Sequence, residues 1–395
     1  GTVLLAEGAR LNSAALGVGS NENSQGTLSL TGTSSLNMLA GNLTAGAGKG
    51  STGTISVADN ASISALMIIA GAGENSSGSI NVSGGEIKTN NMNIAGTGVG
   101  SKGVLTISGG SVVISNSAGT GRLNMGQGDG GSATIAMTGG TLYTQTFVMG
   151  NVSTSTPLLD LSGDAEMTIS NWGNIGGGPS DGSKGTVNIS EGAVLNAKVL
   201  SVGANENSTG TLSMTGTSSL VLGADDPLGE YQGGLYVGGN AGAMGTVSIT
   251  DQAIIYAKNG EISIGNAGNG YYSQTGGTVT ADRGFYVAIA DGASGTASIT
   301  AGKLSVGATL LVGDGGHLSI AGTGTASAAT FAVRSGGSYS GTLYIGAVSG
   351  TPANYAKADT LRVQTGGKID GKTIFNGGGF VLSVSGTQGL QGAAT

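Results

Sequence analysis

The chain repeats itself, and this repetition is the feature that most limits how it can fold. Two segments, Leu16 to Leu39 and Leu200 to Gly223, are identical at 17 of 24 aligned positions by direct count, which indicates a duplication. A shorter unit recurs within and between these copies with a period of about 27 residues, inside the range of solenoid proteins. Because each solenoid repeat contacts only its neighbours, a chain of 395 residues can form one elongated domain.

Each repeat contains three short elements that fit β-strands. The first reads apolar-x-apolar-Gly, as in Leu16 to Gly19, and the second alternates strictly after a glycine-rich turn, as in Gly26 to Gly32. A third element carries one apolar pair, such as Leu36 and Met38. No segment shows the 3.6-residue period of a helix, and a propeller needs longer, four-stranded repeats. The sequence therefore predicts an all-β, single-stranded parallel β-helix (β-solenoid) of about 14 rungs with three strands each.

The repeats are predicted to cover residues 1–346. Beyond Gly313 the pattern loosens, and residues 347–395 are interpreted as an irregular loop followed by a terminal rung or cap of the same solenoid. Gly1-Thr-Val already reads as part of a second element, so the chain starts in mid-rung. Its first strand edge is expected to be covered by further residues or by another molecule, because open edges readily pair.

Composition excludes several classes of protein. Glycine contributes 80 residues, but the four prolines and the lack of a Gly-X-Y register exclude collagen. Hydrophobic residues make up 38% of the chain and recur in order, which a disordered linker would not show. The net charge is −7 and the 15 Lys and Arg residues are scattered, so nucleic acid is not an expected partner. No apolar run approaches the ~18 residues of a membrane-spanning helix, so this chain is not expected to span a membrane.

Enzymatic and metal chemistry are poorly represented. His317 is the single histidine, and the repeats carry no recurring column of acidic residues such as a carbohydrate-active β-helix would need in its groove. No catalytic residue and no cofactor are therefore predicted. Asp129 and Asp314 lie in segments that resemble single copies of the calcium-binding nonapeptide, whose signal is normally tandem. They are weak calcium candidates, and turn capping is the commoner role of such residues.

Hydroxyl side chains occupy the outward positions of the second element. Alternation places them on one face of consecutive rungs, and the candidate surface row is Thr27, Ser29, Thr54, Ser56, Thr211, Ser213, Thr246 and Ser248. Val104, Asp160 and Tyr272 are expected to interrupt it. An ice-binding array, a hydroxyl ladder and O-glycosylation are alternative interpretations of such a row.

Insertions into a solenoid usually fall on one face and often bind partners. The insertion between Gly223 and Gly234 is the most acidic and aromatic stretch, and its binding candidates are Asp225, Asp226, Glu230, Tyr231 and Tyr236. Shorter irregularities lie at Ser115 to Gly121 and Ala347 to Ala358. The tyrosines of the later half either form one patch or serve separately as surface and core residues; they are Tyr231, Tyr236, Tyr256, Tyr271, Tyr272 and Tyr286.

With these elements in view, the chain resembles the passenger domains of type V autotransporters, in particular their adhesin-type repeats. The resemblance rests on the alternation of Leu-x-Val-Gly with Gly-Thr-Leu-x-Val-x-Gly between Asn- and Ser-rich turns, from about Ala9 to Val384. It implies a right-handed coil, export across the outer membrane, an extracellular or bacterial cell-surface location, and roles in adhesion, aggregation or biofilm formation. The chain lacks the Gly-Asp-Ser-Gly motif of serine-protease passengers.

Three functions follow from this sequence, in order of preference. The first is a non-enzymatic adhesin or self-association module whose flat Ser/Thr/Asn-rich face contacts other copies of the chain, or host or environmental glycans. The second is a structural subunit that stacks end to end into an extracellular filament or sheath, and the third is a carbohydrate-active β-helix. The absence of cysteine fits a chain that crosses a second membrane unfolded, although a bias toward Ser and Gly also explains it.

Overall fold

The structure is a computed structural model that describes residues 1–38, 41–223, 233–346, 354–364, 367–376 and 382–384. Within these residues every regular element is a β-strand, and the strands form a parallel β-solenoid, which confirms the predicted fold class; the solenoid has about 13 turns, against the predicted 14 or so. The chain divides into two compact units, Gly1–Ala197 and Lys198–Thr395, each built from the same three-stranded rung.

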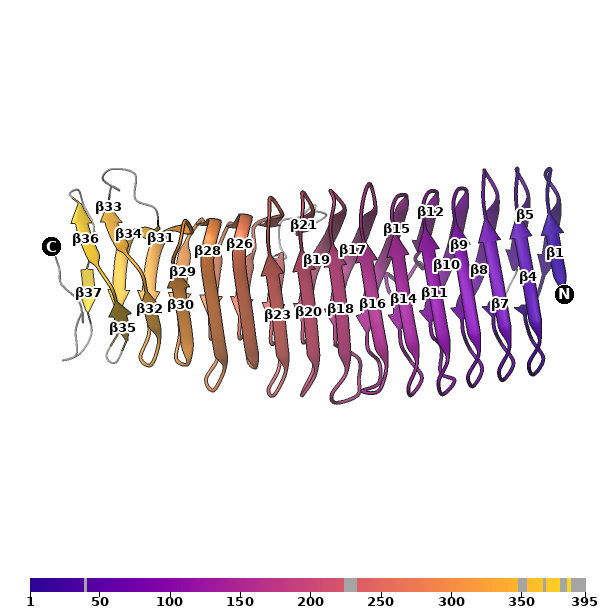
Figure 1. Ribbon diagram of the computed structural model, residues 1–395, viewed down its shortest axis with the longest axis horizontal. Coiled ribbons are helices and arrows are strands. Elements are labelled where there is room, and N and C mark those ends of the chain that lie inside the picture. The colour runs from indigo at the N-terminus through magenta and orange to yellow at the C-terminus, as the bar shows by residue number, and fades with distance from the viewer. Residues whose placement is uncertain (39–40, 224–232, 347–353, 365–366, 377–381, 385–395) are drawn as a thin grey trace. The chain divides into compact units, whose positions relative to one another are not determined.

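In the first unit, the rungs form three parallel stacks of strands (Figure 1). Stack 1 holds the strictly alternating element: β1 (Thr2–Leu5), β4 (Gln25–Leu30), β7 (Thr52–Val57), β9 (Ser77–Val82), β11 (Lys102–Ile107), β14 (Ser132–Met137), β16 (Thr156–Leu161) and β18 (Lys184–Ile189). Stack 2 holds β2 (Arg10–Ser13), β5 (Ser35–Met38) and β12 (Ser111–Ile114), and stack 3 holds β3 (Leu16–Val18), β6 (Asn42–Ala45) and β13 (Arg122–Met125). Four longer strands turn the corner from stack 2 into stack 3: β8 (Ser62–Ala70), β10 (Glu86–Ile94), β15 (Thr141–Met149) and β17 (Glu166–Ile175).

The second unit repeats this plan, and β19 (Val194–Val202) crosses the boundary between the units. Its stack 1 includes β20 (Thr209–Met214), β23 (Met244–Ile249), β30 (Gly316–Ile320), β32 (Ser338–Ser340) and β35 (Lys368–Asp370). Stack 2 includes β21 (Ser219–Leu222), β24 (Ile254–Ala257), β33 (Leu343–Gly346) and β36 (Thr373–Asn376); stack 3 includes β22 (Gly234–Val237), β25 (Glu261–Ile264), β27 (Gly284–Val287), β29 (Thr309–Val312) and β37 (Leu382–Val384). Long strands join neighbouring stacks: β26 (Asn269–Ala281), β28 (Ser294–Val306), β31 (Thr325–Val333) and β34 (Tyr355–Val363).

The core is filled by the inward half of each alternating strand. In stack 1 of the first unit one inward position forms a column of seven residues in register, each at most 1% exposed: Leu28, Ile55, Ile80, Leu105, Ile135, Leu159 and Val187. Full burial of one such side chain stabilises the fold by about 1.5–3 kcal/mol. Because the strand period is two, this column fixes which residues face outward on the same strands.

Glycine is required at the corner that precedes stack 1. A Cβ atom on Gly53 would collide with the backbone of Val18 and Gly46, because three chain segments converge there. Gly26 and Gly78 occupy the same position in the neighbouring rungs. The corner therefore explains why the alternating element so often begins with glycine.

The duplicated segments keep the same local geometry. In the first copy the Ser24 hydroxyl donates to the Asn21 carbonyl (2.7 Å) and accepts from the Asn21 amide (3.1 Å). Ser208 does the same with Asn205, at 2.6 and 3.1 Å. The Asn two residues after each of these asparagines, Asn23 and Asn207, has a positive φ of 54° and 53°, which asparagine tolerates better than most residues.

The strand order is not sequential near the end of the second unit. The first half of β34 pairs with β31 on one side and with β33 on the other, although β33 precedes β34 in the chain. β33 also pairs with β36, so the order in stack 2 is β31, β34, β33, β36. Tyr355 to Ala358, at the described end of the irregularity expected at Ala347 to Ala358, are thus inserted as a strand between β31 and β33.

Candidate functional site

The outward face of stack 1 is lined by short polar side chains and is called the hydroxyl face. In the first unit two of its rows are in register along the strands. One row is Thr27, Thr54, Ser79, Val104, Thr134, Leu158 and Thr186; the other is Ser29, Ser56, Asn81, Thr106, Ala136, Asp160 and Asn188. The first-unit members of the candidate row therefore lie side by side, at the strand spacing of about 4.8 Å.

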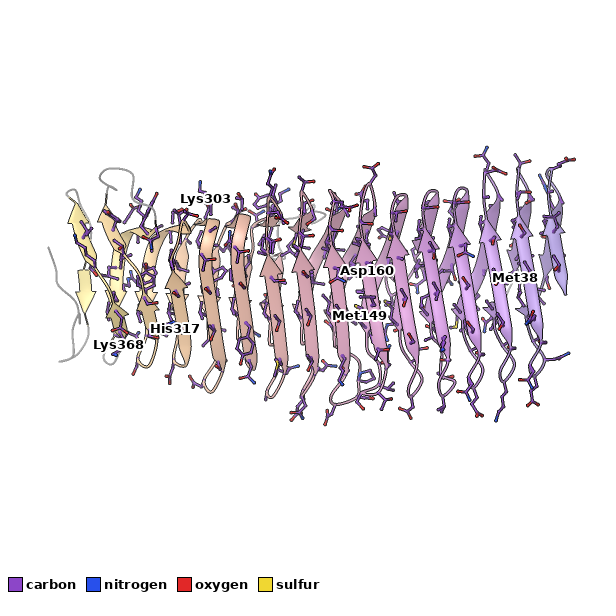
Figure 2. The ribbon with its side chains drawn as sticks, in the orientation of Figure 1. Met38, Met149, Asp160, Lys303, His317 and Lys368 are labelled. Carbon is purple, nitrogen blue, oxygen red and sulfur yellow. The ribbon has the colours of Figure 1, made fainter. Side chains whose placement is uncertain are left out.

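The hydroxyl face is more regular in the second unit. One outward row is Ser213, Ser248, Ser273, Ser298, Ser319 and Ser340, and it is unbroken over six consecutive rungs before Asp370. The parallel row is Thr211, Thr246, Tyr271, Thr296, His317, Ser338 and Lys368. Asp160, His317 and Lys368 are labelled in Figure 2.

Sequence reasoning missed four members of the serine row: Ser273, Ser298, Ser319 and Ser340. Ser273 follows Tyr271-Tyr272, and Ser319 follows His317-Leu318, so their elements depart from the Gly-Thr-Leu-Ser pattern. The signal that identifies them is the preceding corner glycine. Gly270, Gly295 and Gly316 are in register with Gly245, and a serine stands three residues after each; Ser340 likewise stands three residues after Gly337.

The expectation that Tyr272 interrupts the hydroxyl face is wrong. Because Gly270 pairs with Gly245, Tyr271 takes the outward position beside Thr246, and Tyr272 points into the core. Tyr272 is 3% exposed and its hydroxyl donates to Gln274 Oε1 at 2.8 Å, while Tyr271 is 46% exposed. Burial raises the pKa of Tyr272 far above its usual range. Val104 and Asp160 do lie in the outward rows.

Hydrogen bonds within the hydroxyl face use only part of its capacity. Ser248 Oγ donates to Ser213 Oγ at 3.3 Å, and the His317 ring is 2.8 Å from Ser338 Oγ. Each hydroxyl has one donor and two acceptor sites, so the rows keep donors and acceptors that face solvent. In the first unit the face is hollowed, because a cavity of about 470 Å³ lies over Thr134, Leu158 and Thr186.

The insertion between Gly223 and Gly234 contains four of the five binding-loop candidates, Asp225, Asp226, Glu230 and Tyr231, and these lie outside the described residues. The fifth, Tyr236, is on the outward side of β22 in stack 3, and its ring lies over Gly234. Burial, the charge of Glu261 and a hydrogen bond to that carboxylate raise the pKa of Tyr236 to about 12.

The other tyrosines of the later half do not form one patch. Tyr286 shares the stack-3 face with Tyr236, since both are in register with Ser263 between them. Tyr256 faces outward from stack 2, where its hydroxyl donates to Asp282 Oδ2 at 3.1 Å. With Tyr271 on the hydroxyl face, the described surface tyrosines are spread over three faces.

In the first unit the irregularity at Ser115 to Gly121 is a fixed loop. Gln145 Oε1 accepts from the Asn116 and Gly121 amides, at 3.1 and 2.6 Å. The Asn171 side chain donates to the Gly119 carbonyl at 2.8 Å. These bonds hold the loop at the corner between stacks 2 and 3. On the adjoining stack-3 face the Arg122 guanidinium lies 5.8 Å from the centre of the partly exposed Trp172 ring.

The two calcium candidates lie in exposed turns. Asp129 Oδ1 accepts a hydrogen bond from the Thr154 hydroxyl at 3.2 Å. Neither Asp129 nor Asp314 belongs to a group of three or more potential ligands (His, Cys, Asp or Glu) within the described part of the chain. Both residues therefore lie in turns. Calcium binding by them stays a prediction, and the described residues around them supply no cluster of ligands.

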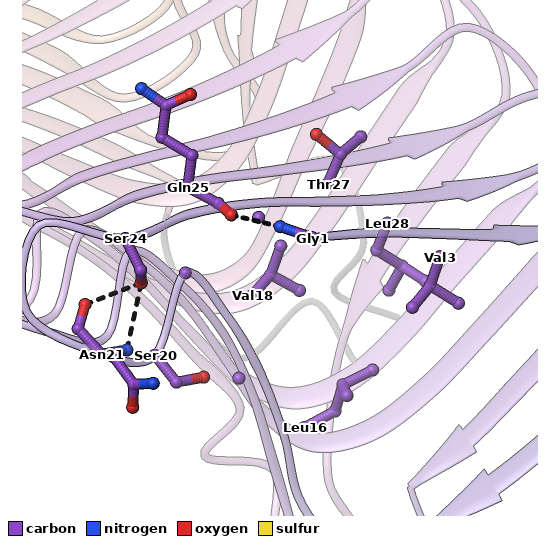
Figure 3. Close-up of a pocket in the computed structure, with 13 residues that line it drawn as sticks. Gly1, Val3, Leu16, Val18, Ser20, Asn21, Ser24, Gln25, Thr27 and Leu28 are labelled. Atoms are coloured by element: carbon purple, nitrogen blue, oxygen red, sulfur yellow. Dashed lines mark hydrogen bonds between the residues drawn. The ribbon is translucent and has the colours of Figure 1, made fainter.

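A hollow of about 310 Å³ opens at the first rung (Figure 3). It is lined by the ends of inward side chains, among them Val3, Val18 and Leu28, and is closed on one side by the Gly1 amino group, which donates to the Gln25 carbonyl at 2.7 Å. The hollow lies where the stacked core ends. Elsewhere in the unit, the inward side chains of the next rung fill the equivalent space. The hollow therefore gives no indication of a ligand site.

A helix with the length and hydropathy needed to cross a membrane does not occur among the described residues.

Comparison with known proteins adds little to these observations. No protein-family profile and no curated protein sequence matches the chain. One solved structure that matches is the crystal structure of a TibC-catalysed, hyper-glycosylated TibA55-350 fragment, which is 15% identical. The match covers 100% of both chains with a TM-score of 0.28. A score this low supports no conclusion about this chain, so its fold is established by its own strands.

Proposed function

We propose that this chain is a non-enzymatic, extracellular surface protein that adheres and self-associates through its hydroxyl face. The observation that carries the proposal is the unbroken serine row from Ser213 to Ser340, with a row of mainly hydroxyl side chains beside it. Such regularity is not needed for the core, because these side chains point outward. An extracellular location is supported by the resemblance of the repeats to exported passenger domains and by the absence of cysteine.

A second copy of the same chain is the partner that fits this face best. A hydroxyl both donates and accepts, so two identical hydroxyl arrays are complementary to each other without any matching of charge. Each hydrogen bond contributes only about 0.5–1.5 kcal/mol net, so a stable contact needs many rungs. A regular array several rungs long meets this requirement, and glycans with closely spaced hydroxyls present similar chemistry.

Lysine substitutions on two faces of the same three rungs provide the test. The face variant combines Ser273→Lys, Ser298→Lys and Ser319→Lys on stack 1. The control combines Thr280→Lys, Ser305→Lys and Ser327→Lys, which are consecutive outward residues of stack 2 in the same unit. Both variants add the same charge, so only the position of the charge differs.

Sedimentation velocity over a range of protein concentrations measures the outcome. We expect the wild-type chain and the control to self-associate, and the face variant to lose at least tenfold in association constant, because like charges facing each other across an interface cost several kcal/mol. A wild-type chain that stays monomeric, or two variants that behave alike, would contradict the proposal. End-to-end fibres in electron micrographs of the face variant would instead favour the filament subunit.

A further inference from the structure

The stack-3 face of the second unit carries a feature that self-association does not use. A hollow of about 380 Å³ lies over the outward side of β29, β31 and β34. Its floor contains Leu311 and Ala332, and its polar lining consists of Thr309, Thr330, Arg334, Arg362 and Gln364. These residues come from three consecutive rungs, since Leu311 pairs with Ala332 and Ala332 with Arg362.

The hollow is cationic in a chain whose net charge is negative. Arg334 and Arg362 are both exposed, and neither guanidinium is in an ion pair with any residue that the structure describes. The Nη1 atom of Arg334 donates to the Ile289 carbonyl at 3.5 Å, and the other N–H groups of this guanidinium stay available. Asp359 is the acidic residue closest to Arg362 in sequence, and it does not line the hollow. Two guanidinium groups beside threonine hydroxyls are suited to a carboxylate or a similar oxyanion.

Aromatic side chains continue the same face. Tyr286 is in register with Leu311, one rung from the hollow, and Tyr236 lies two further rungs along. The Tyr286 ring occupies the space where Gly284 would carry a Cβ, so the absence of a side chain at Gly284 lets the ring lie close to the backbone. Tyr236 and Tyr286 are about 10 Å apart along the solenoid, two strand spacings, which is comparable to a disaccharide unit of an extended polysaccharide.

The geometry points to a binding site for an acidic polysaccharide on the stack-3 face, with a carboxylate in the arginine hollow and a sugar ring against Tyr286. Glu261 lies on the same face in the rung between Tyr286 and Tyr236, so its carboxylate disfavours an acidic sugar beyond Tyr286. The hydroxyls of Thr309 and Thr330 and the amide of Gln364 would bind sugar hydroxyls. A free oxyanion would need only the hollow, whereas a sugar polymer also uses Tyr286. The site is on a different face from the serine row and does not depend on self-association.

Oligogalacturonate binding to the whole chain, measured by titration calorimetry below the concentration of self-association, tests this inference. Arg334→Gln with Arg362→Gln should weaken binding at least tenfold, and Tyr286→Ala should weaken it severalfold. Lys303→Gln removes one positive charge from the stack-2 face and serves as the control, with unchanged affinity expected. All four side chains point outward, and melting temperatures would verify that each variant is folded.

Matched ligands show whether the site binds an acidic sugar, an uncharged sugar, a free oxyanion or an anionic lipid. The methyl-esterified oligomer has the same sugars without charge and should bind much more weakly than the acid. Inorganic phosphate should compete only weakly, because it lacks the contacts to Tyr286. The inference is overturned if no acidic oligosaccharide binds, if the ester binds as well as the acid, if the double arginine variant keeps its affinity, or if anionic phospholipid vesicles bind and the oligomer does not. The triple-lysine face variant should still bind the oligomer, so failure here is distinguishable from failure of self-association.

Discussion

At the scale of single residues, replacing a corner glycine should lower the free energy of unfolding by a measurable amount. Gly53→Ala places a methyl group against the backbone of Val18 and Gly46, neither of which can move without shifting its rung. We expect a loss of about 1–3 kcal/mol, as for other overpacked interiors. Thr52→Ala, on the exposed neighbour, is the control and should be nearly neutral. Thermal and urea unfolding followed by circular dichroism measure both; equal stability of the two variants would contradict the close approach at the corner.

Asp251 is a residue whose charge state affects stability. A hydrogen bond from the Gly216 amide, and a second from the Thr250 hydroxyl, lower the pKa of this exposed carboxyl. A lowered folded pKa means that the carboxylate stabilises the fold above its unfolded pKa of about 4, and that this contribution is lost as the pH falls through the lower folded value. Asp251→Asn should therefore reduce stability at pH 7 and flatten the decline of stability as the pH falls below about 4. Asp291→Asn, in another exposed turn, is the comparison, and identical acid-unfolding curves for Asp251→Asn and wild type would count against this.

At the scale of elements, the Gln145 side chain of the adjacent strand β15 binds both ends of the Ser115 to Gly121 loop. Gln145→Ala leaves the Asn116 and Gly121 amides without their acceptor, which costs about 1–3 kcal/mol in the local opening equilibrium. Hydrogen exchange of these two amides should accelerate by roughly tenfold or more, while the amides of β14 keep their rates. Gln127→Ala, at a half-buried turn, is the control. Unchanged exchange at Gly121 would show that the loop holds its shape without Gln145.

The strand elements also show what can be read from the sequence. Three strands per rung follow from the three recurring apolar elements, and the inward column that begins at Leu28 follows from alternation; both are present. Tyr272 was misplaced because two adjacent tyrosines fit either phase of the alternation, and only the pairing of Gly270 with Gly245 decides between them. Two features depend on backbone geometry that local residue types do not encode. One is the corner where a strand such as β8 or β26 continues into the next stack, and the other is the insertion of β34 between β31 and β33.

At the scale of the whole molecule, charge should modulate association. The chain carries a net charge of −7, whereas the serine row itself is neutral until Asp370. Long-range repulsion between copies is screened by salt, with a Debye length of about 30 Å at 0.01 M falling to about 8 Å at 0.15 M. We therefore expect the association constant to rise several-fold over that range in sedimentation experiments. A steep fall with added salt would instead indicate that ion pairs hold the copies together.

Functional surfaces were predicted less completely than the fold. The eight residues of the candidate row lie on the hydroxyl face, but the four additional serines of the second unit required knowledge of strand register. The arginine hollow gave no sequence signal, because Arg334 and Arg362 are 28 positions apart and meet only through the stacking of β31 and β34.

Hydroxyl-radical footprinting of the wild-type chain tests the central claim most directly, because the chain already has exposed, oxidisable Met, Tyr and Trp side chains on different faces. Met244 and Tyr271, 44% and 46% exposed, lie on the hydroxyl face, while Trp172, 37% exposed, lies on a stack-3 face and Tyr256 on a stack-2 face. As concentration drives self-association, Tyr271 and Met244 should lose most of their reactivity, and Trp172 and Tyr256 should keep theirs. Protection of Trp172 or Tyr256 with Tyr271 still reactive would contradict association through the hydroxyl face.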